Sequence, residues 1–383
     1  MKVFRRALAA TAGRLEQNTK ASLLGLLDAS VCLSYLLAIP VPIWYAAILF
    51  GKALLIVRYG ASKSGFLQIA PFITLISISL IYTEYLEGGY FDEAFNVAGF
   101  ILSLAISASL LRRTDIQPYL YFMALLGTTT AALYLILALF NLIPDHYGRL
   151  MFFNGSHPNL GGESFAMFLI ATIVSFRGLL FWLAWALLTA GIFMMQARAA
   201  LLVAIAVLGL YLWRKFKSAG RYKPMLAMLI FAGSAALILS SSDIILTSTE
   251  NIFLMSDESR GVGTGFVGRE DRWNQALNIF YENPFLGGGF AAFDKTGMLT
   301  PHNYFLAGIS NMGMIAIFMF IYLGYCIWRV KSTDNHILIA FAPLLILMIF
   351  NDRFINMNPY PFTAYVVIFA LSARTRKRVS HHD

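Results

Sequence analysis

Three arginines and one histidine carry the clearest chemical signal in the sequence. Arg198 stands in MMQARAALL, Arg269 and Arg272 stand in REDRWNQALNIFYE, and His302 stands in PHNYFLAGISNMG. An arginine between two apolar runs is costly unless it is paired or used. Permanent cations beside a titratable imidazole suit the binding of a phosphorylated anion and the movement of a proton. An isolated histidine is more often a structural group, so this chemistry depends on the four residues lying together.

The segment 269–282 has the spacing of an amphipathic helix. Its apolar residues recur at positions i, i+3, i+4, i+7 and i+8 and are Trp273, Ala276, Leu277, Phe280 and Tyr281. The pair Asn283–Pro284 then ends the helix. Helical spacing places Arg269 close to Arg272 and Trp273. The same pattern is equally typical of a helix lying on a bilayer with its arginines on lipid phosphates, so spacing alone leaves both interpretations open.

The elements that position these residues are predicted to be membrane spans. Of the 383 residues, 58% are hydrophobic and 13% are charged, whereas a soluble domain carries about 25% charged residues. A soluble globule is therefore excluded. A span needs about 17–25 apolar residues, and we predict twelve, near 21–39, 42–57, 67–84, 95–111, 119–143, 164–176, 178–195, 199–213, 225–241, 304–328, 336–350 and 361–373.

Several of these stretches are short, so the number of spans could differ by two. The two stretches on either side of Arg177 could also form one broken element. Lys52 lies inside the second stretch, where its long side chain could reach an interface by snorkelling.

The distribution of charge predicts the orientation of the spans. With the N-terminus in the cytoplasm, 21 of the 29 lysines and arginines fall on the cytoplasmic side and seven on the outer side, which holds 15 of the 20 acidic residues. This bias is typical of cytoplasmic loops and predicts both termini inside. The net charge of +9 then reflects orientation, so no nucleic-acid partner is expected. Cys32 and Cys326 lie in apolar runs and indicate no disulfide framework.

Two outer segments, 144–163 and 242–303, are longer than simple turns and are expected to have a function. We therefore predict an N-terminal membrane bundle over 1–241 that includes the loop 144–163, an outer helical loop over 242–303, and last spans with a basic tail over 304–383. Motifs for nucleotide phosphates, for zinc and for an Asp-x-Asp metal site do not occur. No cofactor or metal is expected, and the glycines in GVGTG (261–265) and LGGGF (286–290) are interpreted as flexible turns.

In their order and spacing, these residues resemble the bacterial O-antigen ligase and polymerase family of polytopic glycosyltransferases. That pattern has an arginine after a mid-chain span, then R-x3-W, NPxxGxG and a histidine–asparagine pair, and an earlier G-R and hP-N stretch. The matching residues here are Arg198, Arg269, Trp273, Asn283–Gly289, His302–Asn303, Gly148–Arg149 and His157–Pro158–Asn159. The similarity extends over roughly 144–320.

The resemblance implies an all-α, GT-C-like polytopic protein of the bacterial inner membrane with its site facing the periplasm. The implied donor is a glycan on undecaprenyl pyrophosphate, and the implied acceptor is a sugar hydroxyl on lipid A–core or on another lipid-linked glycan. Arg198 and Arg269 would hold the pyrophosphate in an inverting displacement. His302 would act as general base on the acceptor hydroxyl or else orient it. Further substrate contacts are expected at Arg272, Arg149, His157, Asn159 and Asn303, whereas Trp273 would anchor its helix.

Other functions remain open at this stage. A ligase is favoured slightly over a polymerase because the chain lacks a second large outer loop. A secondary transporter would also have twelve spans with both ends inside, but the two halves show no convincing repeat, and the informative charges lie on one face. A non-catalytic scaffold would explain the spans but not the arginines and the histidine.

Overall fold

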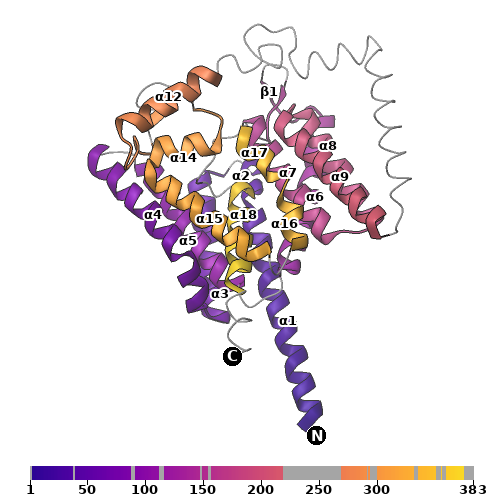
Figure 1. Cartoon of the computed structure of the whole chain (residues 1–383). Coiled ribbons are helices and arrows are strands. Elements are labelled where there is room, and N and C mark those ends of the chain that lie inside the picture. Colours follow the sequence, from indigo (N-terminus) through magenta and orange to yellow (C-terminus); the bar gives the residue numbers. More distant parts are fainter. Residues whose placement is uncertain are drawn as a thin grey trace.

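The computed structural model is a bundle of helices in which α1 (Lys2–Ala29) begins and α18 (Pro359–Arg374) ends at one side, called here the lower end (Figure 1). It describes residues 2–37, 39–87, 91–111, 116–146, 149–153, 157–218, 269–290, 292–293, 300–331, 335–350, 355 and 359–374. The predicted span 225–241, the glycine segment 261–265 and the predicted basic tail after Arg374 lie outside the described residues.

The first half of the chain supplies nine helices among the described residues, and a pair of two-residue strands. The helices are α1 (Lys2–Ala29), α2 (Val31–Leu36), α3 (Val41–Tyr59), α4 (Lys63–Glu87), α5 (Phe91–Leu111), α6 (Gln117–Leu139), α7 (Pro158–Ser175), α8 (Leu179–Met194) and α9 (Arg198–Ser218). The strands β1 (Asp145–His146) and β2 (Arg149–Leu150) pair antiparallel. Prolines in the first turns of α3, α6 and α7 favour helix starts there.

The second half supplies the elements nearest to the candidate site. They are α12 (Arg269–Glu282), α14 (Tyr304–Met312), α15 (Met314–Lys331), α16 (Asn335–Phe341), α17 (Leu344–Phe350) and α18 (Pro359–Arg374). Helices α12 and α14 lie at the end opposite to the termini, called here the upper end (Figure 1).

The prediction that this is a helical, multi-pass membrane protein is confirmed. Among the described residues, five helical segments are long and apolar enough to cross a membrane: Pro42–Tyr59, Gly65–Thr83, Gln117–Leu139, Arg198–Lys217 and Met314–Lys331. Shorter apolar helices cover Phe95–Leu111, Leu179–Met194, Asn335–Phe350 and Pro359–Ala373. The number twelve stays a prediction.

Two predicted spans are wrong as single helices. The stretch 304–328 is divided into α14 and α15 at Gly313, whose φ of 58° is incompatible with a continuing helix. The stretch 336–350 is divided into α16 and α17. The stretches on either side of Arg177 form two separate helices and not one broken element. Helix α7 ends at Ser175, and α8 begins at Leu179 after a turn through Gly178, whose φ is 57°.

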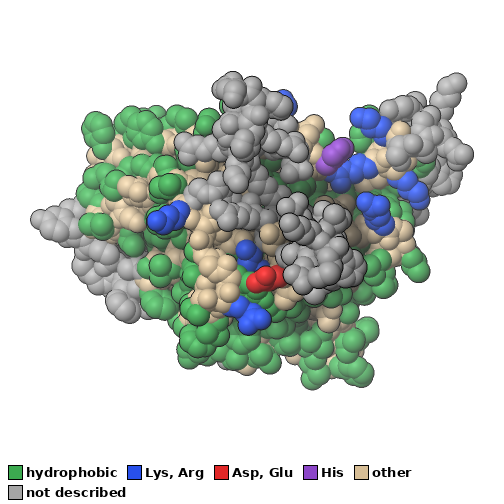
Figure 2. Space-filling model, turned by 90° about the horizontal axis from the view of Figure 1, so that it is seen from below, with side chains coloured by type: hydrophobic (Ala, Val, Ile, Leu, Met, Phe, Trp, Pro, Cys, Tyr) green, Lys and Arg blue, Asp and Glu red, His purple; other side chains and the backbone are tan. Residues whose placement is uncertain are grey.

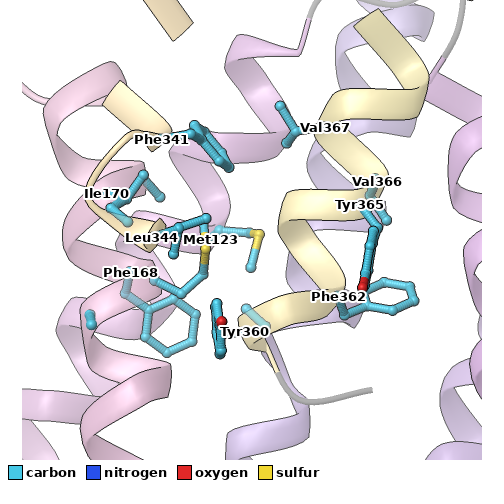
Figure 3. Packing of buried hydrophobic residues seen from close by; sticks show 14 of the residues in the cluster. Met123, Phe168, Ile170, Phe341, Leu344, Tyr360, Phe362, Tyr365, Val366 and Val367 are labelled. Atoms are coloured by element: carbon cyan, nitrogen blue, oxygen red, sulfur yellow. The ribbon is translucent and has the colours of Figure 1, made fainter. Parts of the chain in front are cut away.

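Helix α7 is the centre of the bundle. Every residue from Leu160 to Ile173 is buried, and α7 packs against α6, α8, α9 and α18. Gly127 of α6 leaves room for the ring of Phe168, since a Cβ there would lie 2.1 Å from the Phe168 Cγ. Figure 3 shows the side chains of this core turned toward one another, among them Met123, Phe168, Leu344 and Tyr360. This central packing fixes the ends of α7, α8 and α9 relative to one another.

Cations gather at the lower end of the membrane helices. The last turns of α3, α9 and α15 carry Arg58, Lys215, Lys217, Arg329 and Lys331. Figure 2 views the molecule from this end and shows Lys and Arg side chains standing among hydrophobic ones. This placement agrees with the charge bias that predicts a cytoplasmic lower end.

Lys52 does not snorkel, contrary to the sequence-based expectation. Its side chain is fully buried, and its Nζ lies 2.5 Å from Oδ1 of Asp28 in α1. The Nζ also donates to the Ser103 hydroxyl and lies 4.6 Å from the ring centroid of Phe362, while the Tyr119 hydroxyl donates to Asp28 Oδ2 over 2.9 Å. Lys52 and Asp28 thus compensate each other's charge where water is excluded, and their ion pair connects α3 to α1 inside the bundle.

Replacing Lys52 by methionine is expected to lower the free energy of unfolding by about 3–5 kcal/mol, because Asp28 would keep a buried charge without its counter-ion. Unfolding of the purified protein in mixed micelles measures the change. The double variant Asp28→Asn/Lys52→Met removes both charges and is expected to recover most of the loss. Equal stability of the wild type and Lys52→Met would contradict the structural role of the pair.

Candidate functional site

Arg269 begins α12 and lies close to two other arginines. Its side chain is half-buried, as are those of Arg198 and Arg272. Burial lowers the pKa of Arg269, and the positive charges of Arg198 and Arg272 lower it further. The sequence-based expectation that these three residues lie together therefore agrees with the structure. Arg269 and its two like-charged neighbours form a site whose electrostatics favour an anion.

Arg269 stands at the N-terminus of its helix, where the backbone N–H groups of the first turn have no acceptor within the helix and can bind an anion. Arg269 and Arg272 stand in the first turn of α12, where the helix dipole disfavours cations. Glu270 and Asp271, also in that turn, are exposed and offset the effect. The first-turn N–H groups and the arginines together would attract a phosphate.

A ring at the end of α17 lies beneath Arg269. The Arg269 Cζ lies 5.2 Å from the centroid of the Phe350 ring, a distance at which the ring face attracts a cation. Sequence reasoning missed Phe350, because an aromatic residue that ends an apolar stretch has no chemical signature of its own. Only the fold brings it to Arg269.

His302 is held between two anchored neighbours. Before it, the carbonyl of Pro301 accepts a hydrogen bond of 3.0 Å from Trp273 Nε1 of α12. After it, Asn303 Nδ2 donates to the carbonyl of Ile349 over 3.4 Å. Because Ile349 and Phe350 are adjacent, the end of α17 contacts both Asn303 and Arg269, and this brings the histidine segment and the arginine helix to one place.

The backbone at His302 is itself unusual. His302 has a φ of 45°, a left-handed conformation that few residues other than glycine adopt. Asn303 caps α14, since its Oδ1 accepts from the backbone N–H groups of Phe305 and Leu306 at 3.0 and 3.1 Å. Backbone strain of this kind persists where the surroundings fix it and is frequent at active sites.

Replacing Trp273 by phenylalanine is expected to lower activity about fivefold while leaving the fold intact. The substitution keeps the ring but removes the hydrogen bond to Pro301, worth about 1 kcal/mol, which sets His302 relative to Arg269. The rate of the glycan transfer that the family resemblance implies, taken at saturating donor, measures this. Tyr281→Phe removes an exposed hydroxyl from the same helix and serves as control. An unchanged rate in Trp273→Phe would contradict the positioning role.

The segment LGGGF is not a flexible turn, contrary to the sequence-based interpretation. Its backbone is bonded to the junction of α14 and α15: Gly288 N donates to Ser310 O over 2.8 Å and Gly289 N to Asn311 O over 3.0 Å. In the other direction, Met314 N donates to Pro284 O over 2.8 Å. The segment therefore fixes α12 to the helix that follows His302.

Replacing Gly287 by alanine is expected to destabilise the protein by about 2 kcal/mol or more. Its φ is +73°, and a Cβ there would lie 2.4 Å from the carbonyl carbon of Asn311, so strain and overpacking combine. Thermal unfolding in detergent measures the effect. Gly209→Ala is the matched control, because a Cβ at Gly209 meets nothing within 4 Å. Equal unfolding temperatures for the two variants would contradict this interpretation.

Arg198 is the first residue of α9 and follows a tight turn from α8. Gln196 in that turn has a φ of 50°, and Ala197 is buried against α7, where a Cβ at Gly162 would come within 2.2 Å of the Ala197 Cβ. The glycine of α7 thus lets the turn approach the central helix. This packing sets where Arg198 emerges at the upper end.

The earlier outer loop is also placed at the start of α7. His157 is the N-cap of that helix, and its Nδ1 accepts a hydrogen bond of 3.2 Å from the Asn159 backbone N–H. Both residues are exposed. Arg149 lies in β2, opposite His146. Substrate contacts at Arg149, His157 and Asn159 stay predictions, and the structure adds that one nitrogen of His157 serves as a helix cap.

The described elements thus place the arginines of α9 and α12 and the histidine before α14 at the upper end of the bundle. No curated protein matches the chain. A family model does: residues 179–321, from the start of α8 into α15, match the O-antigen ligase family, which confirms the predicted resemblance over that part of the chain.

Proposed function

We propose that this protein transfers a glycan from undecaprenyl pyrophosphate to an acceptor sugar hydroxyl at the periplasmic face of the bacterial inner membrane. The observation that carries the proposal is the cluster of Arg198, Arg269 and Arg272 in the segment that matches the O-antigen ligase family. That domain is shared by O-antigen ligases and polymerases and points to lipid-linked glycans as substrates. Several helices are long and apolar enough to cross a membrane, and cations lie at their lower ends. This distribution of charge supports a cytoplasmic location for both termini.

The arginines are proposed to bind the leaving group. As the bond to the anomeric carbon breaks, negative charge grows on the oxygen that joined this carbon to the nearer phosphorus of the diphosphate. Arg198 and Arg269 would stabilise that charge without a metal, because preorganised cations in a half-buried site act most strongly where charge develops. Arg272 would supply a further donor. Burial and the positive charges of Arg198 and Arg272 lower the pKa of Arg269, and binding of the diphosphate would relieve the repulsion between these charges.

His302 is proposed to act as general base. The acceptor oxygen forms a bond to the anomeric carbon as the bond from that carbon to the phosphate oxygen breaks. The hydroxyl proton passes to the imidazole, and the electron pair of the broken bond leaves on the pyrophosphate. Attack opposite the leaving group inverts the anomeric centre. The fixed backbone between Pro301 and Asn303 supports this role, since a base must keep its position through the reaction.

The reaction is proposed to be that of an O-antigen ligase, with lipid A–core as the acceptor. The alternative is a polymerase of the same family, which would join lipid-linked repeats. Arg149, His157, Asn159 and Asn303 are proposed as contacts to the glycan or to phosphate. For Asn303, whose side chain caps α14 and bonds to Ile349, an indirect role through His302 has the stronger support.

Reconstitution in liposomes with a lipid-linked donor and each acceptor in turn tests this proposal. A ligase gives product on lipid A–core only, whereas a ladder of products on the carrier lipid identifies the polymerase. Transfer to neither acceptor, with a folded protein and a donor that a known transferase accepts, would contradict both functions.

A further inference from the structure

A groove far from the candidate active site opens between α3, α4 and α5. It has a volume of about 560 Å³, and its lining includes Ile56, Ser62, Lys63, Phe66, Leu67 and Leu102. These residues come from the last turns of α3, the turn after it, the first turns of α4 and the second half of α5. The groove therefore lies in the lower half of the bundle.

The wall of the groove faces outward from the bundle. Phe66, Leu67 and Leu102 are exposed over 50%, 61% and 55% of their surface. Large apolar side chains so exposed on membrane helices contact lipid, so the groove opens toward the bilayer and not toward water. A volume within the range of ligand pockets with such a lining suits a hydrocarbon chain.

Two of the helices that form the groove, α4 and α5, are held together by a close approach of their backbones. A Cβ at Gly65 would lie 2.8 Å from the Cα of Ser109 and 3.1 Å from the Ala108 carbonyl oxygen, so α4 can contact α5 closely only because residue 65 is glycine. Gly60, at φ +71°, makes the turn that leads from α3 to Lys63. The groove is thus formed by the packing of the helices before any ligand enters.

Positive charge lies at one end of this apolar groove. Lys63 lines it from the first turn of α4 and is exposed, and Arg58 is exposed in the last turn of α3. Basic pockets between membrane helices on the cytoplasmic side suit anionic head groups. An apolar groove that ends at exposed cations is complementary to a phospholipid, in which a hydrocarbon chain is followed by a negatively charged phosphate.

We propose that this groove holds an acyl chain of an anionic glycerophospholipid of the cytoplasmic leaflet, with its phosphate on Lys63. The site is distinct from that of the lipid-linked donor, because the three arginines lie at the opposite end of the bundle (Figure 1). A bilayer is already apolar, so an acyl chain gains little by entering the groove. Selectivity then comes from the head group, at about 1 kcal/mol per lysine near the surface, or about fivefold in affinity.

Native mass spectrometry of the full-length protein, released from nanodiscs of phosphatidylglycerol and phosphatidylcholine in equal amounts, tests the proposal. The wild type is expected to retain phosphatidylglycerol in preference to phosphatidylcholine. Lys63→Gln should lower that preference about fivefold. Lys331→Gln is the matched control, since Lys331 is exposed in the last turn of α15 and lines no part of the groove.

A second pair of variants tests the groove itself without changing charge. Leu102→Trp fills the groove from an exposed position and is expected to remove the preferential retention of phosphatidylglycerol, whereas Ile321→Trp, at an exposed position of α15, should leave that preference unchanged. A preference unaffected by Leu102→Trp would overturn the proposal. So would an equal loss in Lys63→Gln and Lys331→Gln, which would mean that lipid follows surface charge alone. The proposal does not depend on the proposed glycan transfer, because lipid retention is measured without substrate.

Discussion

Replacing His302 by alanine is expected to lower the rate of glycan transfer by about two to four orders of magnitude, the usual contribution of a positioned general base. The loss should appear at saturating donor, because the imidazole acts on the acceptor hydroxyl and not on the pyrophosphate. Initial rates with a fluorescent lipid-linked donor measure it. The backbone strain at φ 45° is eased by glycine, so His302→Gly separates the two contributions.

His336→Ala is the matched control for the histidine, since His336 is exposed at the start of α16. The Arg214 guanidinium donates to the backbone carbonyl of His336, a contact that alanine keeps. It should keep the wild-type rate. If His302→Gly and His302→Ala both transfer glycan as fast as the wild type, with unchanged unfolding temperatures, His302 is not the base.

Replacing Arg269 by glutamine is expected to lower the rate about 100- to 1,000-fold, because one preorganised donor to the developing charge is lost. Arg269 is half-buried beside two other cations that favour an anion. The loss of its charge therefore also lowers the affinity of the protein for the diphosphate. Initial rates over a range of donor concentrations separate these two effects. Removing a like charge relieves repulsion, and the protein should remain folded.

Arg329→Gln provides the charge-matched control, since Arg329 lies in the last turn of α15 at the lower end. Arg272→Gln should have a smaller effect than Arg269→Gln, because Arg269 also contacts Phe350 and stands closest to the start of the helix. A wild-type rate in Arg269→Gln would exclude it from the binding of the leaving group.

Local patterns in the sequence predicted local structure well. The helix expected over 269–282 has the bounds Arg269–Glu282 in the structure, because its apolar period and the Asn–Pro pair that ends it are both local signals. The break of the stretch 304–328 at Gly313 was not predicted. It depends on hydrogen bonds between the α14–α15 junction and residues 284–289, and these partners are distant in sequence.

Pairings between helices could not be predicted for the same reason. Asp28 and Lys52 each lie in an apolar stretch, and nothing in either stretch indicates that α1 and α3 bring their charges to 2.5 Å. At the candidate site, residue types and order indicated Arg198, Arg269 and His302. The contribution of α17, through Ile349 and Phe350, follows from tertiary packing alone.

The most direct measurement of the central claim is the release of undecaprenyl pyrophosphate by the purified protein in liposomes, with donor, acceptor and a metal chelator present. We expect the wild type to release one carrier pyrophosphate for each glycan transferred, and we expect Arg269→Gln to reduce this release at least 100-fold. Release at the wild-type rate by Arg269→Gln, or a wild-type protein that releases no carrier pyrophosphate with either acceptor, would contradict this claim.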